Sequence, residues 1–142
     1  MEYKLFDHYL PSEAIDIRYR VFTLEQGFKK EDDLDDIDKD SIHILVFIKN
    51  KAIATARMFK VDDSTFHIGR LAILKEYRHK GVGSFILSIF ENVAKTKNVT
   101  VIELGSQIDK TLFYEKNGYT KYGDIFDDAG YPHILMKKLI QN

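Results

Sequence analysis

Arg78-His79-Lys80-Gly81-Val82-Gly83 is the stretch of this 142-residue chain on which the prediction of its fold depends. The apolar run Leu71 to Leu74 before it predicts a strand, and the apolar residues of Ser84 to Ala94 after it recur at helical spacing. Glycine lets the backbone turn sharply and lets a ligand come close, and the first N–H groups of a helix favour an anion. The sequence therefore predicts a basic glycine turn, between a strand and a helix, that binds a phosphate group.

Two widespread phosphate loops do not match this stretch. The Walker pattern requires Gly-x-x-x-x-Gly-Lys-Ser/Thr, and the dinucleotide fingerprint requires a further glycine where this chain has Ile86. The stretch does match the shorter pattern Arg/Gln-x-x-Gly-x-Gly/Ala. On that pattern alone, a surface turn rich in glycine and basic residues is as good an interpretation as a phosphate site.

The composition predicts one domain, residues 1–142, with an ordinary core, because 44% of the residues are hydrophobic and 30% are charged. The formal net charge of -1 argues against a nucleic-acid partner held by bulk charge. The chain has no cysteine, which excludes disulfides, cysteine nucleophiles and thiolate metal sites, and no metal site is predicted. It shows neither a signal peptide nor an apolar run of membrane-spanning length, so we expect a cytoplasmic protein without a membrane partner.

Periodicity and turn residues predict a mixture of strands and helices, an α/β (α+β) protein. The predicted strands are 3–6, 42–48, 52–61, 65–74, 99–104, 119–126 and 132–139, and the predicted helices are 11–27, 84–94 and 108–117. The three strands between residues 42 and 74 follow one another through short turns, so we expect them to be antiparallel. The strand after the long helix should lie parallel to the strand before it, by a right-handed crossover.

Charged residues in the first third of the chain are expected to be solvated. Arg18 and Arg20 lie on the flanks of the first predicted helix. Seven of the ten residues from Glu31 to Asp40 are acidic, which is typical of a solvated loop. The alternative for this acidic run is that some of its carboxylates face an acceptor site and attract a cationic amine.

The order of elements and two motifs in register resemble the GNAT superfamily of N-acetyltransferases. The stretch from Arg78 to Gly83 follows the fourth predicted strand, where that family has its pyrophosphate loop. The later stretch Phe113-Tyr114-Glu115-Lys116-Asn117-Gly118-Tyr119 looks like the family segment F-Y-x-x-x-G-F, with tyrosine as the last aromatic residue. The resemblance implies the GNAT fold, a central mixed sheet of about seven strands with about four helices, splayed between the fourth and fifth strands.

A narrower resemblance covers most of the chain and is to the small bacterial ElaA/YjcF-like branch of the GNAT proteins. The matching residues lie in several predicted elements: Arg18-Tyr19-Arg20-Val21-Phe22 with Glu25-Gln26, Asp35 with His43, Gly69-Arg70, Leu104-Gly105-Ser106-Gln107, and Phe126-Asp127-Asp128-Ala129-Gly130 with His133 and Met136. The branch usually has alanine where this chain has Ser106.

The resemblance implies acetyl-CoA as the cofactor and assigns residues to it. The main chain of the fourth strand would bind the pantetheine arm through Leu71, Ala72 and Ile73. The glycine turn would bind the pyrophosphate through residues Arg78, His79, Lys80, Gly81, Val82, Gly83 and Ser84, with Arg78 and Lys80 as the outer charges. Gln107 would hold cofactor or substrate, and Tyr114 would lie near the thioester sulfur as the acid.

The base and the acceptor-binding residues are less sharply predicted. A lysine-like amine has a pKa of about 10.4, so a proton must leave before the amine can attack. The candidates for taking that proton, directly or through water, are Glu25, Asp35, His43, Glu103 and His133, of which we rank Glu25 and His43 with Tyr114 as catalytic. The candidates for binding substrate are Arg57, Asp35 and His133; a buried Arg57 would need a carboxylate partner, either Asp35 or a substrate group.

Two functions of different class follow from these residues. The first is an acetyl-CoA-dependent N-acetyltransferase that moves an acetyl group to a primary amine of a small molecule or peptide by direct attack in a ternary complex, which agrees with the lack of cysteine. The second is a non-catalytic module that binds CoA as a sensor or scaffold. The sequence identifies neither the acceptor amine nor the oligomeric state, for which a homodimer is one option.

Overall fold

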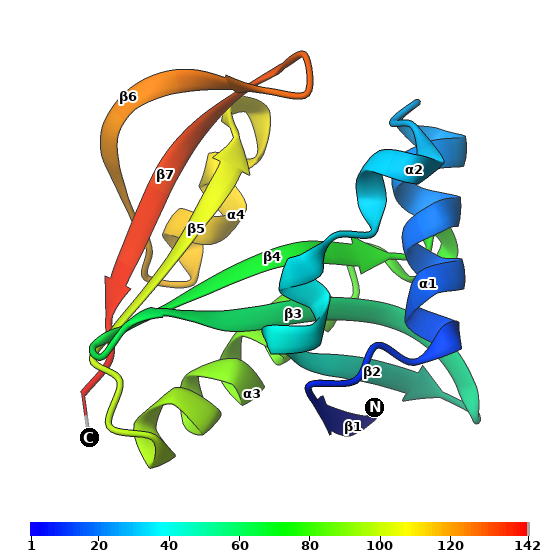
Figure 1. The fold of residues 1–142 in the computed structure, drawn as a ribbon, viewed down its shortest axis with the longest axis horizontal. Helices are drawn as coiled ribbons and strands as arrows, with labels where there is room; N and C mark the ends of the chain where they lie inside the picture. Colours follow the sequence, from blue (N-terminus) through cyan, green and yellow to red (C-terminus); the bar gives the residue numbers. More distant parts are fainter. Residues whose placement is uncertain (142) are drawn as a thin grey trace. The chain divides into compact units, whose positions relative to one another are not determined.

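The computed structural model describes residues 1–141 and contains every strand that the sequence predicts (Figure 1). None of the helices in this range has the length and apolar character needed to cross a membrane. The elements, in chain order, are β1 (Glu2–Asp7), α1 (Ser12–Arg18), the π-helix η1 (Tyr19–Glu25), α2 (Lys30–Asp33), the 3₁₀ helix η2 (Asp36–Asp40), β2 (Ile42–Ile48), β3 (Lys51–Asp62), β4 (Thr65–Ile73), the 3₁₀ helix η3 (Lys75–Tyr77), α3 (Val82–Thr96), β5 (Val101–Gln107), the 3₁₀ helix η4 (Ile108–Lys110), α4 (Thr111–Lys116), β6 (Thr120–Asp128) and β7 (Tyr131–Leu139).

The strands form a mixed sheet with the order β1-β2-β3-β4-β5-β7-β6. β1 with β2, β2 with β3, β5 with β7 and β6 with β7 are antiparallel pairs, and β4 with β5 is the parallel pair expected from the crossover through α3. The sheet of seven strands with four α-helices is the predicted GNAT fold. The sequence analysis did not predict that β7, the last strand, lies between β5 and β6.

The parallel ladder between β4 and β5 is short. It runs from Thr65 opposite Val101 to Ile68 opposite Leu104, although β4 continues to Ile73 and β5 to Gln107. Such a short ladder is what the splay expected between the fourth and fifth strands requires. Two residues beyond the last pair, Arg70 has a φ of 51°, a left-handed conformation that is unusual for a residue other than glycine.

The chain forms two compact units. The first unit comprises Met1–Phe59 and Arg70–Ile86, and the second comprises Lys60–Gly69 and the described residues from Leu87 onward. In the first unit α1 packs against the sheet (Figure 1). The apolar cluster beneath α1 consists of Ala14, Ile17, Val21, Leu45, Ala72 and Leu74.

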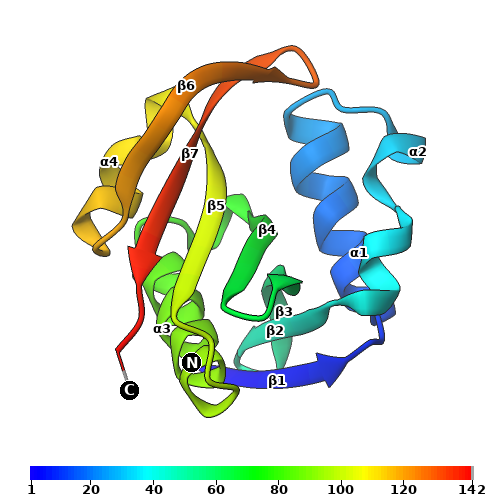
Figure 2. The ribbon, with the colours of Figure 1, turned by 60° about the vertical axis from the view of Figure 1, so that its left-hand side comes forward.

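In the second unit α4 lies against one face of the sheet that contains β5, β7 and β6 (Figure 2). Alternation along β5 buries Ile102, Leu104 and Ser106 and turns Glu103, Gly105 and Gln107 to the other face. Every residue of β6 is exposed. The second unit therefore carries its polar candidate residues on the face of the sheet opposite the buried one.

Two predictions about the first third of the chain need correction. The first helix begins and ends as predicted, but from Tyr19 it continues as a π-helix, and Leu24, expected on an apolar stripe, is 63% exposed. The acidic run is not a loop, because it contains α2 and η2. Asp35 caps η2 by accepting a hydrogen bond from the N–H of Ile37.

Candidate functional site

The glycine turn lies in the first unit, between η3 and α3, as the sequence predicts. Gly81 has a φ of 82°, and a Cβ added to it would meet no atom within 4 Å, so its outer side is open. The first hydrogen bond of α3 joins the N–H of Phe85 to the carbonyl of Gly81, at 3.0 Å. The N–H groups of Val82, Gly83 and Ser84 precede this bond and have no acceptor within the helix. An open turn before such amides fits a phosphate group.

The three basic side chains of the turn differ in their surroundings. His79 and Lys80 are exposed, and the Lys80 Nζ lies 6.0 Å from the centre of the Tyr77 ring. Arg78 instead donates from Nε to the carbonyl of Ile73 at 2.9 Å and from its two terminal nitrogens to Glu25 at 2.8 and 2.9 Å. The turn therefore offers Lys80 and His79 as outer donors, whereas Arg78 is engaged within the protein.

Arg78 and Glu25 were predicted for separate roles, and the structure brings them together. Both oxygens of the Glu25 carboxylate accept from the guanidinium of Arg78. A carboxylate held in this way does not act as a base unless the ion pair first opens. This contact was not foreseen because the two residues are 53 positions apart in the sequence.

The end of β4 carries the residues expected to meet pantetheine. Ala72 is buried, and Leu71 and Ile73 are half-buried. The carbonyl of Ile73 accepts from Arg78, and the N–H of Leu74 donates to the carbonyl of Ile53 on β3 at 2.9 Å. A carbonyl has two lone pairs, so the bond from Arg78 leaves Ile73 able to accept a second donor.

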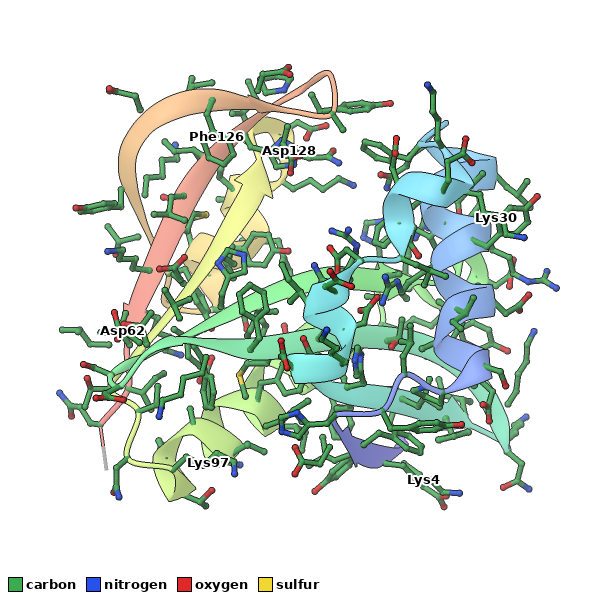
Figure 3. All side chains as sticks on the ribbon, in the orientation of Figure 1. Lys4, Lys30, Asp62, Lys97, Phe126 and Asp128 are labelled. Carbon is green, nitrogen blue, oxygen red and sulfur yellow. The ribbon has the colours of Figure 1, made fainter. Side chains whose placement is uncertain are left out.

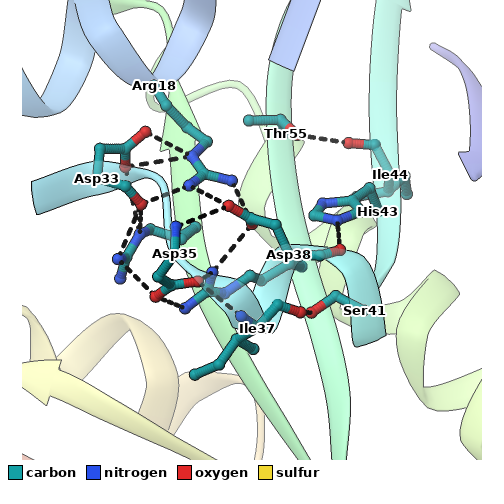
Figure 4. A network of polar contacts seen from close by, with 11 residues as sticks. Arg18, Asp33, Asp35, Ile37, Asp38, Ser41, His43, Ile44 and Thr55 are labelled. Atoms are coloured by element: carbon teal, nitrogen blue, oxygen red, sulfur yellow. Dashed lines mark hydrogen bonds and ion pairs between the residues drawn. The ribbon is translucent and has the colours of Figure 1, made fainter. Parts of the chain in front are cut away.

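A network of three arginines and three aspartates holds the acidic segment in the first unit (Figure 4). Arg18 lies 2.9 Å from Asp33 and 2.8 Å from Asp38, and only 1% of Arg18 is exposed. Arg18 is therefore not the solvated flank residue that was expected, whereas Arg20 is exposed beside Asp16, as predicted. Arg57, Arg70 and Asp35 complete the arginine–aspartate network.

Arg57 is the buried arginine with a carboxylate partner that the sequence suggested. It is 4% exposed, and its NH1 lies 2.7 Å from Asp35 and 3.0 Å from Asp38. Asp35 also accepts from Arg70, at 3.3 Å. Both charges of the predicted substrate-binding pair are therefore balanced within the network, so neither Asp35 nor Arg57 offers a free charge to a substrate.

The pKa values of Asp35, Asp38 and Arg18 are shifted in the directions that keep these side chains charged and paired. Burial alone raises the pKa of Asp38, but the hydrogen bonds and charges of Arg18 and Arg57 outweigh it and lower this pKa to about 2. Burial also raises the pKa of Asp35, but Arg57 and Arg70 outweigh it and lower this pKa. Burial lowers the pKa of Arg18, yet Asp38 and Asp33 raise it by more. Both carboxylates stay ionised. The expectation that the acidic run is solvated is wrong for Asp38, which is 7% exposed, whereas Asp35 is exposed as expected, although it is paired with Arg57.

His43 is enclosed by the same part of the first unit. It is 1% exposed, and its Nε2 lies 2.8 Å from the main-chain oxygen of Asp38. Burial is the main cause that lowers its pKa. A ring so enclosed does not reach an acceptor amine in this conformation, so its position counts against the catalytic role expected for His43.

Tyr114 stands on α4 in the second unit and is half-buried among aromatic rings. Its ring meets those of Phe113 and Tyr119 edge-on, with centroids 4.9 and 6.2 Å away. Burial raises the pKa of Tyr114 to about 12. The phenol is therefore protonated near neutral pH and can donate its proton, as an acid must.

Gln107 and His133 are direct partners across β5 and β7. The Nδ1 of His133 lies 2.8 Å from the carbonyl of Tyr131, and its ring lies 5.9 Å from that of Phe126. A carbonyl only accepts, so Nδ1 carries the proton, and in the neutral ring Nε2 has the free lone pair.

The surroundings of His133 are acidic and aromatic. A carboxylate oxygen of Asp128 lies 4.0 Å from Nε2. Figure 3 shows Phe126 and Asp128 on β6, toward its turn into β7. The Phe126 ring lies beside Gly105, where an added Cβ would be in ordinary contact with it, at 3.6 Å.

Glu103, another base candidate, has a partner that the sequence analysis missed. Its carboxylate lies 2.7 Å from Nδ1 of His67, and the two residues are opposite each other in the parallel ladder of β4 and β5. The prediction that these strands are parallel contained the signal, because it placed residues near 67 beside residues near 103.

Comparisons with known proteins agree with this fold. The acetyltransferase (GNAT) domain family matches residues 19–140. The N-acetyltransferase YjcF of Bacillus subtilis is 32% identical over 127 residues, which are 89% of this chain and 90% of YjcF. ElaA of Escherichia coli is 30% identical over 128 residues, which are 87% of this chain and 84% of that protein.

Solved structures give the same result. The crystal structure of Escherichia coli ElaA has a TM-score of 0.84 and 26% identity, and the match covers 96% of this chain and 98% of that one. An aminoglycoside 6'-N-acetyltransferase in complex with coenzyme A has a TM-score of 0.74 at 16% identity. This match covers 100% of this chain and 98% of that one. These matches confirm the predicted ElaA/YjcF-like resemblance. The chain belongs to the GNAT family of acetyltransferases.

Proposed function

We propose that this chain is an acetyl-CoA-dependent N-acetyltransferase whose acceptor is a primary amine of a small molecule or peptide. The observation that carries the proposal is the open glycine turn before the first amides of α3, which fits a diphosphate. The coenzyme A bound to the aminoglycoside acetyltransferase of the same fold supports the choice of cofactor. When bound, acetyl-CoA supplies an acetyl group activated as a thioester.

The residues that hold the cofactor belong to the first unit. The main-chain N–H groups of Val82, Gly83 and Ser84 would donate to the diphosphate, with exposed Lys80 and His79 as outer donors. The main chain of β4 from Leu71 to Ile73 would bind the pantetheine arm.

Tyr114 is the acid in this proposal. Attack by the amine nitrogen on the acetyl carbon breaks the carbon–sulfur bond and leaves negative charge on sulfur, which a nearby phenol stabilises by donating its proton. The phenol carries this proton at neutral pH, as a tyrosine of ordinary pKa near 10 also does, and burial raises its pKa further, to about 12. Direct attack also suits a chain that has no cysteine to carry an acyl group.

His133 is the base that the contacts favour among the candidates. Glu25 is paired with Arg78, Asp35 with Arg57, and Glu103 with His67, while His43 is enclosed. His133 also has an acidic neighbour, but the carboxylate oxygen of Asp128 is 4.0 Å from Nε2, farther than the partners of the other candidates. The carbonyl of Tyr131 fixes the proton on Nδ1, so the Nε2 lone pair can accept one from the acceptor ammonium.

A screen for release of free CoA thiol tests this function against the alternative of a CoA-binding sensor. Acetyl-CoA is incubated with a panel of polyamines, aminosugars and lysine peptides, using the wild-type chain, Tyr114→Phe and the control Tyr9→Phe, which alters an exposed tyrosine. We expect acceptor-dependent thiol release that Tyr114→Phe lowers by about 10²-fold, the lower end for a lost proton donor, and that Tyr9→Phe leaves unchanged. CoA binding without thiol release for any acceptor would favour the sensor.

A further inference from the structure

Arg78, the first residue of the glycine turn, joins three elements of the first unit. Its Nε donates to Ile73 at the end of β4, and its terminal nitrogens donate to the two carboxylate oxygens of Glu25 at the end of η1. The planar guanidinium matches a carboxylate in two parallel bonds, which are stronger and more directional than those of an ammonium. The donors that Arg78 directs at Glu25 and Ile73 are therefore engaged inside the first unit.

Glu25 is presented by an unusual helix. η1 continues α1, but the N–H of Gln26 donates five residues back, to the carbonyl of Val21 at 3.2 Å. π-helical turns are rare and often occur at functional sites. Because a π-helix has more residues per turn than an α-helix, it directs Glu25 differently from an α-helical continuation of α1.

The hydrogen bond from Arg78 to the carbonyl of Ile73 links the two ends of the segment between β4 and the glycine turn. Between β4 and Arg78 the chain forms η3, in which the N–H of Tyr77 donates to Leu74 at 2.9 Å and that of Arg78 to Lys75 at 3.4 Å. Gly81 follows only three residues after Arg78. An arginine fixed at both Glu25 and Ile73 therefore determines where the chain enters the turn.

We propose that Arg78 and Glu25 are a positioning pair that orients the amides of the glycine turn, and that Arg78 does not itself bind the diphosphate of CoA. The inference rests on the proposed function, because it concerns how the same turn receives the cofactor. It reverses the role expected for Arg78 as an outer charge and leaves that role to Lys80. It also gives Glu25 a part in cofactor binding in place of proton transfer.

The two roles for Arg78 predict opposite effects of removing Glu25. If Arg78 bound the diphosphate, Glu25→Gln would free its charge and tighten CoA binding. If the two residues are a positioning pair, Glu25→Gln weakens CoA binding about tenfold, the loss expected for a charge-assisted hydrogen bond. Arg78→Gln then weakens binding by a similar factor, and the double variant is no weaker than either single variant.

The experiment is a double-mutant cycle on CoA affinity, measured by calorimetry for the wild-type chain, Glu25→Gln, Arg78→Gln and the double variant. Arg20→Gln, which breaks the exposed Arg20–Asp16 pair on the same helical segment, is the control and should bind CoA like the wild type. Arg78→Lys keeps the positive charge but loses the planar pair of N–H donors, so its CoA affinity should resemble that of Arg78→Gln. In acetyl transfer, Glu25→Gln and Arg78→Gln should each raise KM for acetyl-CoA and leave kcat near the wild-type value.

The outcomes separate this inference from the proposed function. Wild-type binding of CoA with unchanged or tighter binding by Glu25→Gln overturns the positioning pair alone. Retained affinity in Arg78→Lys, or losses that simply add in the double variant, also contradict it. If the wild-type chain binds no CoA, the proposed function fails, and the positioning pair fails with it.

Discussion

Proton transfer in the proposed reaction rests on two side chains of the second unit, Tyr114 and His133. Their environments differ in a way that suits opposite tasks. Tyr114 is a half-buried phenol whose pKa is raised to about 12, so it carries its proton at neutral pH. His133 is fixed by the carbonyl of Tyr131 as the tautomer with a lone pair on Nε2, so its neutral ring can accept one.

Replacement of His133 tests the base through the pH profile. We expect His133→Gln to lower kcat/KM at pH 7 by about 10²-fold, the lower end for general-base catalysis. Activity should then rise with pH toward the pKa of a lysine-like acceptor, about 10.4, because the free amine forms there without a base. His8→Gln, at an exposed histidine of the first unit, is the control. Equal activity of His133→Gln and wild type from pH 6 to 9 would exclude His133 as the base.

Single residues show where sequence reasoning succeeded and where it could not. The glycine turn before α3 and the helix that carries Tyr114 were predicted correctly because their motifs are local, and each depends on neighbours a few positions away. The contacts of Arg18 and Glu25 were not predicted because their partners, Asp38 and Arg78, are 20 and 53 positions away. An arginine on a helix flank has the same local sequence whether it is solvated or buried among carboxylates.

At the scale of elements, the arginine–aspartate network attaches α2 and η2 to α1, β3 and β4. Asp38 of η2 has a central place, because it accepts from both Arg18 and Arg57. Its folded pKa is about 2, against an ordinary value of 3.8, and this difference corresponds to about 2 kcal/mol of folding free energy. Because the pKa is lowered by folding, this stabilisation is present above about pH 4 and is lost as the pH falls toward 2.

Asp38→Asn should therefore destabilise the fold in a pH-dependent manner. Near pH 7 we expect the free energy of unfolding to fall by about 3 kcal/mol, because Arg18 keeps its charge and loses a buried partner. The difference from wild type should shrink between pH 4 and pH 2, where wild-type Asp38 itself becomes protonated. Urea titrations at a series of pH values measure this, with the exposed Asp36→Asn as the control. A difference that does not change with pH would contradict the role given to Asp38.

At the scale of the whole molecule, the order along the chain of the strands, and of the helices apart from α2, η2 and η3, could be predicted from the sequence. Apolar periodicity and turn residues found all seven strands, and the crossover rule predicted that β4 and β5 are parallel. The place of β7 between β5 and β6 could not be read in this way, because strand order is decided by long-range pairing. The π-helix η1 was missed because its hydrophobic spacing is close to that of an α-helix.

The central claim is that the turn at Gly81 binds the diphosphate of CoA, and a calorimetric titration of CoA tests it most directly. The comparison is between wild type, Gly81→Val and the control Gly123→Val; both glycines have positive φ and open surroundings, so the two substitutions strain the backbone alike. We expect wild type and Gly123→Val to bind CoA and Gly81→Val to bind it much more weakly. No heat of binding with the wild-type chain, or equal affinity in Gly81→Val, would contradict the central claim.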